Sequence, residues 1–202
     1  FGIMNCPRVN RDDPGMTCRI YEFAGSTHDY RYAMNDFYRG ERPIDGVNYP
    51  SVYRGAEKVP NNFPCEYPMN AAYDHFLRWV ETGDAPKHAP LFQRDSTGEN
   101  LTDALGNCLG GVRTAFVDLP TRRYLPWSTW EREGKPYRNS LYGHERPFSA
   151  EFLKELYGSL ANYEQRVREA TARHIAQGFV LREEAEALIQ EAICLAAEGG
   201  LA

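Results

Sequence analysis

The stretch RIYEFAGSTHDY, residues 19–30, joins a short β-prone run to a turn that carries a histidine. Apolar and polar residues partly alternate from Cys18 to Ala24, and this pattern predicts a strand. The strand is expected to stop at Gly25, and His28 follows in the loop. Loops at strand ends are where α/β architectures present functional side chains. His28 is therefore the candidate catalytic residue of this chain.

A neutral imidazole in such a loop can take a proton from a nucleophile and later return it to a leaving group. A histidine that only hydrogen-bonds its loop neighbours is the open alternative. Asp12 and Asp13 precede the strand and could orient the imidazole, but Asp-Asp-Pro-Gly is also an ordinary turn sequence. The other histidines have no metal-ligand spacing, so we expect no metal and no cofactor. His75 lies on a predicted helix and His88 in a proline-rich run. His144 lies in a loop and His174 on a surface helix.

A candidate nucleophile lies in the pentapeptide 106–110, Gly-Asn-Cys-Leu-Gly, which fits the thiol version of a nucleophile elbow. Such an elbow needs a strand before it and a helix directly after it. Two glycines and β-prone residues follow Cys108, so we predict a strand over 111–119 and a β-hairpin near 103–119. A cysteine hydrolase that pairs Cys108 with His28 remains an alternative. No G-x-S-x-G pattern occurs in the 202 residues.

Bulk composition narrows the class of protein. With 202 residues, 42% of them hydrophobic, the chain suits one domain of ordinary size, or one domain with an appendage. A net charge of −5 does not favour nucleic acid or an anionic membrane surface as a partner. No run approaches the roughly 18 apolar residues of a membrane span. The five cysteines form no CxxC pair, so a structural zinc site is not expected and disulfide pairing stays open.

Three segments differ in character along the chain. Residues 1–35 are predicted to hold the last core strand and the histidine loop, and residues 36–148 to be rich in irregular loops. Within the second segment, a helix is predicted over 68–83, with Ala72, Phe76, Trp79 and Val80 along one face. The long loop over 36–67 carries three tyrosines that could cover a substrate mouth: Tyr38, Tyr49 and Tyr53.

Residues 149–202 are predicted to form a three-helix unit. Ser149 is expected to cap the first helix, the second spans 160–177 and ends at Gly178, and the third spans 181–197. Each helix carries apolar residues at helical spacing, which indicates packing against a neighbour.

The stretch RIYEFAGSTHDY resembles the end of the catalytic core in the alpha/beta hydrolase domain proteins, a mostly bacterial, esterase-like family of serine hydrolases. Four further stretches are similar to this family in the same order: RDDPG (11–15), CEYPMNAAYDHFLRWVETGDAPKHAPLF (65–92), DALGNCLGGVRTAFVDLP (103–120) and LYGSLANYEQRVREATARHIAQGFVLREEAEALIQEA (156–192). The resemblance is piecewise but collinear over nearly the whole chain. One departure is Ala115, near which the family has a proline.

The resemblance implies an α/β fold class: the C-terminal portion of an α/β-hydrolase fold, with long irregular loops and a terminal helical unit. It implies that His28 is the general base and acid of a carboxylic-ester hydrolase acting on a small-molecule or polymeric ester. The serine nucleophile and the acidic residue are then expected upstream of Phe1, in the remaining N-terminal part of the hydrolase. This places Asp12 and Asp13 in a polar turn rather than in the triad.

Other questions stay open at this point. A non-catalytic structural or interaction subunit derived from the same fold is the alternative function. Substrate-binding residues are unknown. A secreted or periplasmic location is favoured over a cytoplasmic one.

Overall fold

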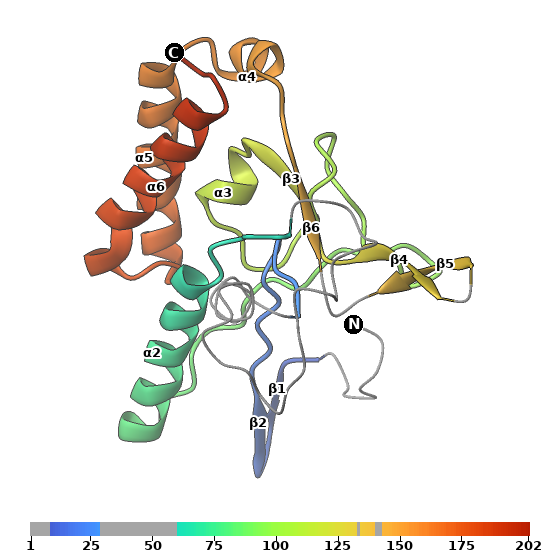
Figure 1. Cartoon of the computed structure of the whole chain (residues 1–202). Coiled ribbons are helices and arrows are strands. Elements are labelled where there is room, and N and C mark those ends of the chain that lie inside the picture. Colours follow the sequence, from blue (N-terminus) through green and yellow to red (C-terminus); the bar gives the residue numbers. More distant parts are fainter. Residues whose placement is uncertain (1–8, 29–59, 133, 140–142) are drawn as a thin grey trace, which may run out of the picture. The chain divides into compact units, whose positions relative to one another are not determined.

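The computed structural model describes residues 9–28, 60–132, 134–139 and 143–202 of the chain (Figure 1). Helices and short strands are both present, so the content is mixed α/β. The chain divides into two compact units, which are described separately. The first unit contains Phe1–Ala24, Glu66–Thr121 and Phe148–Ala202, and the second contains Gly25–Cys65 and Arg122–Pro147.

The first unit begins with a small antiparallel hairpin, β1 (Arg11–Asp13) and β2 (Met16–Cys18). Gly15 in the connecting turn has a φ of +79°, a backbone conformation that glycine adopts without strain. The strand predicted from Cys18 to Ala24 was wrong, because β2 ends at Cys18 and no strand forms over 19–24.

Between β2 and His28, the pairing consists of an isolated parallel bridge between Phe23 and Val112. Two backbone hydrogen bonds flank it: Ala24 donates to the carbonyl of Val112 at 3.0 Å, and Val112 donates to the carbonyl of Glu22 at 2.7 Å. The amide of Ile20 is taken by the side chain of Asn10 at 2.9 Å, so it is not available to a neighbouring strand. A side-chain acceptor thus replaces part of the predicted ladder.

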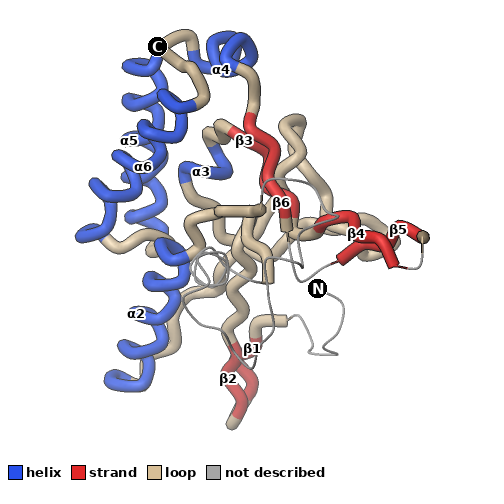
Figure 2. The backbone as a smooth tube through the Cα atoms, viewed as in Figure 1, coloured by secondary structure: helices blue, strands red, loops and turns tan. Residues whose placement is uncertain are grey.

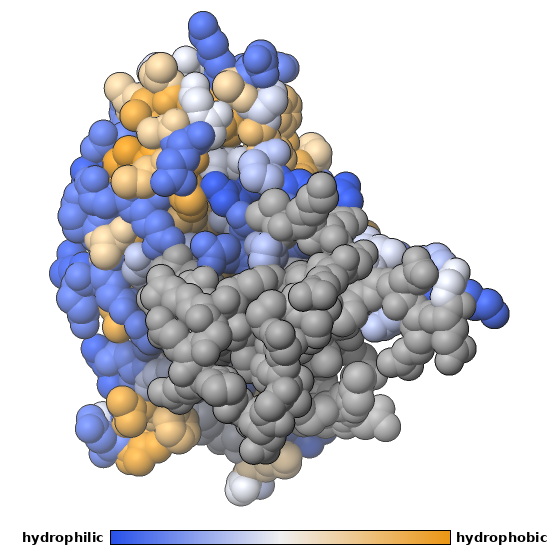
Figure 3. Space-filling model, viewed as in Figure 1, coloured by the Kyte–Doolittle hydropathy of each residue, from blue (hydrophilic) through white to orange (hydrophobic). Residues whose placement is uncertain are grey.

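Helix α2 (Glu66–Thr82) is the helix predicted over 68–83, and it ends before Gly83, whose φ is +79°. Its buried residues are Tyr67, Pro68 and Ala71. The apolar face predicted for this helix is largely open at its end, because Phe76 is 55% exposed and Val80 is 67% exposed. Figure 3 shows apolar surface over the end of α2 that carries these two side chains.

The predicted strand over 111–119 was wrong, because this segment contains a short helix, α3 (Ala115–Asp118). The amides of Val117 and Asp118 both donate to the carbonyl of Thr114 at 3.0 Å, which closes a helical turn. The hairpin near 103–119 is present only in its first part, where Thr102 and Cys108 form an antiparallel bridge. Local backbone bonds after Thr114 therefore prevail over the β propensity of this segment.

The C-terminal region of the first unit consists of α4 (Ala150–Tyr157), α5 (Leu160–Gln177), a 3₁₀ turn η2 (Arg182–Glu184) and α6 (Ala185–Glu198). The predicted cap is present: Ser149 Oγ accepts a hydrogen bond from the amide of Phe152 at 3.3 Å. Figure 2 shows α5 and α6 running side by side. Their shared apolar stripe is buried and includes Val167, Ala170, Leu188 and Ala192.

In its described residues, the second unit contains two two-stranded antiparallel sheets. Strand β3 (Arg122–Leu125) pairs with β6 (His144–Pro147), and β4 (Ser128–Arg132) pairs with β5 (Lys135–Asn139). Phe63 packs edge-on against Tyr124 on β3, with ring centroids 5.2 Å apart.

Among the described residues, the helices are too short or too polar to cross a membrane.

Candidate active site

The loop that carries His28 lies in the second unit and is held at three successive residues. Gly25 has a φ of +88°, and its carbonyl accepts a hydrogen bond from the side chain of Asn61. Ser26 Oγ lies 3.4 Å from the sulfur of Cys65. Thr27 Oγ1 lies 3.5 Å from the carbonyl of Pro126, at the limit of hydrogen bonding. The side chain of His28 is exposed at the end of this anchored loop.

Asn61 makes four hydrogen bonds beside this loop, and only 2% of it is exposed. Its Nδ2 donates to the carbonyl of Gly25 at 3.0 Å and to the carbonyl of Leu125 at 3.2 Å. Its Oδ1 accepts from the amide of Phe63 at 2.9 Å, and its own amide donates to the carbonyl of Gly143 at 3.1 Å. A buried amide group with its donors and acceptor satisfied fixes its surroundings firmly.

The neighbouring polar residues of this unit are structural. His144 was expected in a loop, but it begins β6 and is only 1% exposed, with its Nδ1 hydrogen-bonded to the carbonyl of Trp127 at 2.7 Å. Glu145 is buried, forms an ion pair with Arg122 and accepts from the amide of Asn62 at 3.0 Å. These contacts leave His28 as the exposed imidazole of the described part of the second unit.

Asp12 binds partners within the first unit. Its Oδ1 pairs with Arg19 at 2.7 Å, and its Oδ2 is hydrogen-bonded to Nε2 of His88 at 2.7 Å. These two hydrogen bonds, with the Arg19 bond contributing most, hold the pKa of the Asp12 carboxyl below its usual range. Asp13 lies on β1 and is paired with Met16 across the hairpin. The pairing of Asp12 with His88 was not predicted, because 76 residues separate them in the sequence.

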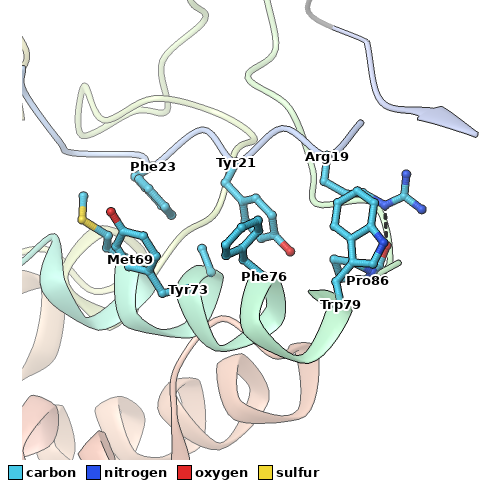
Figure 4. A pocket seen from close by; sticks show the side chains of 9 residues that line it. Arg19, Tyr21, Phe23, Met69, Tyr73, Phe76, Trp79 and Pro86 are labelled. Carbon is cyan, nitrogen blue, oxygen red and sulfur yellow. Dashed lines mark hydrogen bonds between the residues drawn. The ribbon is translucent and has the colours of Figure 1, made fainter. Parts of the chain in front are cut away.

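Two pockets flank Tyr21 in the first unit. The apolar one has a volume of about 430 Å³, and in Figure 4 the side chains of Tyr21 and Phe23 face Tyr73 and Phe76 on α2. The more polar one has a volume of about 690 Å³ and is lined by His75, among others. Tyr21 Oη is hydrogen-bonded to Nδ1 of His75 at 2.9 Å, and burial lowers the pKa of that imidazole. A neutral His75 accepting from Tyr21 fits this geometry.

His174 lies on α5, within the helix predicted over 160–177, and its side chain is buried. It is 3% exposed, and its Nε2 is hydrogen-bonded to Asp118 Oδ2 at 2.9 Å. His174 lies three to four residues from Ala170 and Thr171, which are also buried on α5. Helical spacing was the available signal for its burial, whereas its partner on α3 required the tertiary structure.

Cys108 lies in the first unit, where its sulfur is 3.8 Å from Nδ2 of Asn100. Burial raises the pKa of this thiol, which opposes the thiolate that a cysteine nucleophile requires. Of the cysteines in the described ranges, Cys18, Cys65, Cys108 and Cys194 are free thiols. Within those ranges, no group of three or more potential metal ligands is assembled. The three tyrosines predicted to cover a substrate mouth lie outside the described residues: Tyr38, Tyr49 and Tyr53.

A family match defines the class of protein. The family model for the alpha/beta hydrolase domain matches residues 3–190, which is most of the chain. The chain therefore belongs to the alpha/beta hydrolase domain family.

Individual proteins of known name match the chain less closely. It is 28% identical over 210 aligned residues to the serine/threonine-protein kinase MRCK beta of Rattus norvegicus and of Homo sapiens. Each alignment covers 92% of this chain but 11% of the kinase, so the chain spans about a tenth of the length of these curated relatives. No solved structure matches the chain.

Proposed function

We propose that this chain supplies the general base and acid, His28, to a serine hydrolase of carboxylic esters. The observation that carries the proposal is an exposed imidazole on a firmly held loop in a chain of the alpha/beta hydrolase domain family. The proposed substrate is a small-molecule or polymeric ester.

The proposed chemistry uses one imidazole twice. His28 accepts the proton of a serine hydroxyl as its oxygen attacks the ester carbonyl, and a tetrahedral intermediate forms. The imidazolium then gives this proton to the departing alkoxide, which leaves an acyl-enzyme and an alcohol. In the second half, His28 takes a proton from water, the hydroxide attacks the acyl-enzyme, and the proton returns to the serine oxygen as the acid leaves. An exposed imidazole suits this role because the reacting groups must reach it.

The nucleophile in this proposal comes from sequence outside these 202 residues. The seven serines are Ser26, Ser51, Ser96, Ser128, Ser140, Ser149 and Ser159, and none of them lies in a G-x-S-x-G pattern. The acidic member of the triad is proposed to come from the same source. The partner of this chain is thus the remaining N-terminal part of the hydrolase.

A kinase activity is not proposed, although the named relatives are kinases. Phosphoryl transfer by protein kinases uses an H-R-D catalytic loop and a D-F-G metal-binding motif. Neither tripeptide occurs in the 202 residues, so the similarity brings none of that chemistry to this chain.

The proposal is tested by replacing His28 in the full-length protein and measuring hydrolysis of an aryl ester. His28→Asn should lower kcat/KM by about 10²–10⁴-fold, because proton transfer to and from the reacting oxygens is lost. His88→Asn is the matched control, since His88 is also exposed but is hydrogen-bonded to Asp12. Activity of His28→Asn within about twofold of the unmodified protein would refute the proposal. Ester hydrolysis by none of the three proteins would favour the non-catalytic interaction subunit.

A further inference from the structure

We propose that Asn61 is the positioning residue for the catalytic loop, and that its side-chain amide sets where His28 is presented. This inference rests on the proposed function of His28. The carboxamide lies three residues from His28 through its bond to the carbonyl of Gly25, and it does not contact the reacting groups itself. Its role is to define the geometry of the turn.

Three features of Asn61 support this role over simple packing. Its Nδ2 bonds two carbonyls from separate segments, Gly25 at 3.0 Å and Leu125 at 3.2 Å, so it ties the loop to the end of β3. Its Oδ1 accepts from the amide of Phe63 at 2.9 Å, which fixes the orientation of the carboxamide plane. Burial removes water as a competing partner, so loss of the amide would leave both carbonyls without that donor.

The loop that presents His28 has further contacts beside the Asn61 bond. Ser26 Oγ lies 3.4 Å from the sulfur of Cys65, and Thr27 Oγ1 lies 3.5 Å from the carbonyl of Pro126. Gly143 lies close to Thr27, since a Cβ atom built on this glycine would meet Thr27 at 3.0 Å. Alongside these contacts, the Asn61 side chain ties the start of this loop to the end of β3. A small shift of the loop backbone moves the imidazole that follows, and a displacement of about 1 Å can cost about 10²-fold in rate.

The test compares Asn61→Asp with Asn62→Asp in the full-length protein. Aspartate keeps the shape and the acceptor of Asn61 but cannot donate to the two carbonyls when ionised. Asn62 has an exposed side chain and binds Glu145 through its backbone amide, so it is a matched control. We expect Asn61→Asp to lower kcat by about 10–100-fold with KM changed less than about twofold, and to move the His28 ring resonances. Asn62→Asp should change neither.

The His28 ring signal and side-chain amide exchange separate a failure of the positioning role from a failure of the proposed function. The His28 ring signal, assigned by its loss in His28→Asn, reports loop geometry whether or not the protein hydrolyses esters. If Asn61→Asp moves this signal but His28→Asn keeps full activity, the positioning stands and the proposed function fails. If Asn61→Asp leaves the signal and kcat unchanged, the positioning fails. Should Asn61→Asp not fold, side-chain amide exchange in the unmodified protein decides: Asn61 should exchange much more slowly than Asn62, and equal rates would overturn the inference.

Discussion

Asp118 shows how one carboxylate joins three segments of the first unit. Its Oδ1 pairs with Nε of Arg113 at 2.6 Å, and its Oδ2 is hydrogen-bonded to His174 at 2.9 Å. Arg113 also reaches Asp103 at 3.2 Å, where a turn begins. Burial raises the pKa of Asp118, but the hydrogen bonds from His174 and Arg113 outweigh it and hold the pKa below its ordinary value. The charged form is therefore favoured in the folded protein.

Replacing Asp118 by Asn should lower the free energy of unfolding by about 1.5–3 kcal/mol at neutral pH, because hydrogen bonds to a charged acceptor are lost. Since the folded pKa is depressed, this stabilisation is complete above the ordinary carboxyl pKa of 3.8 and is lost as the pH falls through the folded value. Urea unfolding should show the difference at pH 7 and a smaller difference below about pH 3.8. The exposed Asp84→Asn is the control, and equal losses in both variants would contradict this account.

At the scale of elements, α2 turns an apolar face outward. Tyr67, Pro68 and Ala71 are buried, whereas Phe76 and Val80 are more than half exposed. The hydrophobic spacing that identified the helix placed Phe76 and Val80 on one face with Ala72 and Trp79. Periodicity locates an apolar stripe, but which face meets other elements depends on tertiary packing.

Two lysine substitutions on α2 distinguish its buried and exposed faces. Val80→Lys should change the free energy of unfolding by less than about 0.5 kcal/mol, because the side chain is 67% exposed. Ala71→Lys should cost on the order of 4 kcal/mol or prevent folding, because residue 71 is 1% exposed and burying an ammonium group is costly. Thermal and urea unfolding measure both. A large loss from Val80→Lys would show that this face is covered in the folded protein.

The helices were the most predictable elements, because local signals define their ends. The predicted helix over 160–177 matches α5, where Gly178 follows in a left-handed conformation with a φ of +80°. The segment after Thr114 was not predictable in this way, because its β-prone residues form α3. Ala115 is the first residue of that helix, and the family that this sequence resembles has a proline near this position. Proline is favoured at this helical position, so the departure does not conflict with the fold.

The candidate site was predictable only where its signal is local. Glycine at residue 25 marked the end of the β-prone run, and the exposed His28 follows from that break. The anchor at Asn61 carries no such signal, because its partners Gly25 and Leu125 are 36 and 64 residues away. Contacts over such separations depend on how the chain folds back, which residue patterns do not encode locally.

At the scale of the whole molecule, membership of the alpha/beta hydrolase domain family and the site chemistry converge on one account. The chain holds an exposed imidazole on an anchored loop, and its one elbow-like thiol, Cys108, has a raised pKa. No G-x-S-x-G pattern occurs in the same 202 residues, so the proposed mechanism takes its serine from elsewhere in the protein.

The most direct test is labelling of the full-length protein with a fluorophosphonate, which reacts with an activated serine by displacement of fluoride. The account predicts one modified serine outside these 202 residues, and labelling about 10²-fold slower or more in His28→Asn, because the base no longer activates the hydroxyl. Peptide mass mapping locates the label. Modification of one of the seven serines of this sequence, or equal labelling rates with and without His28, would contradict the account.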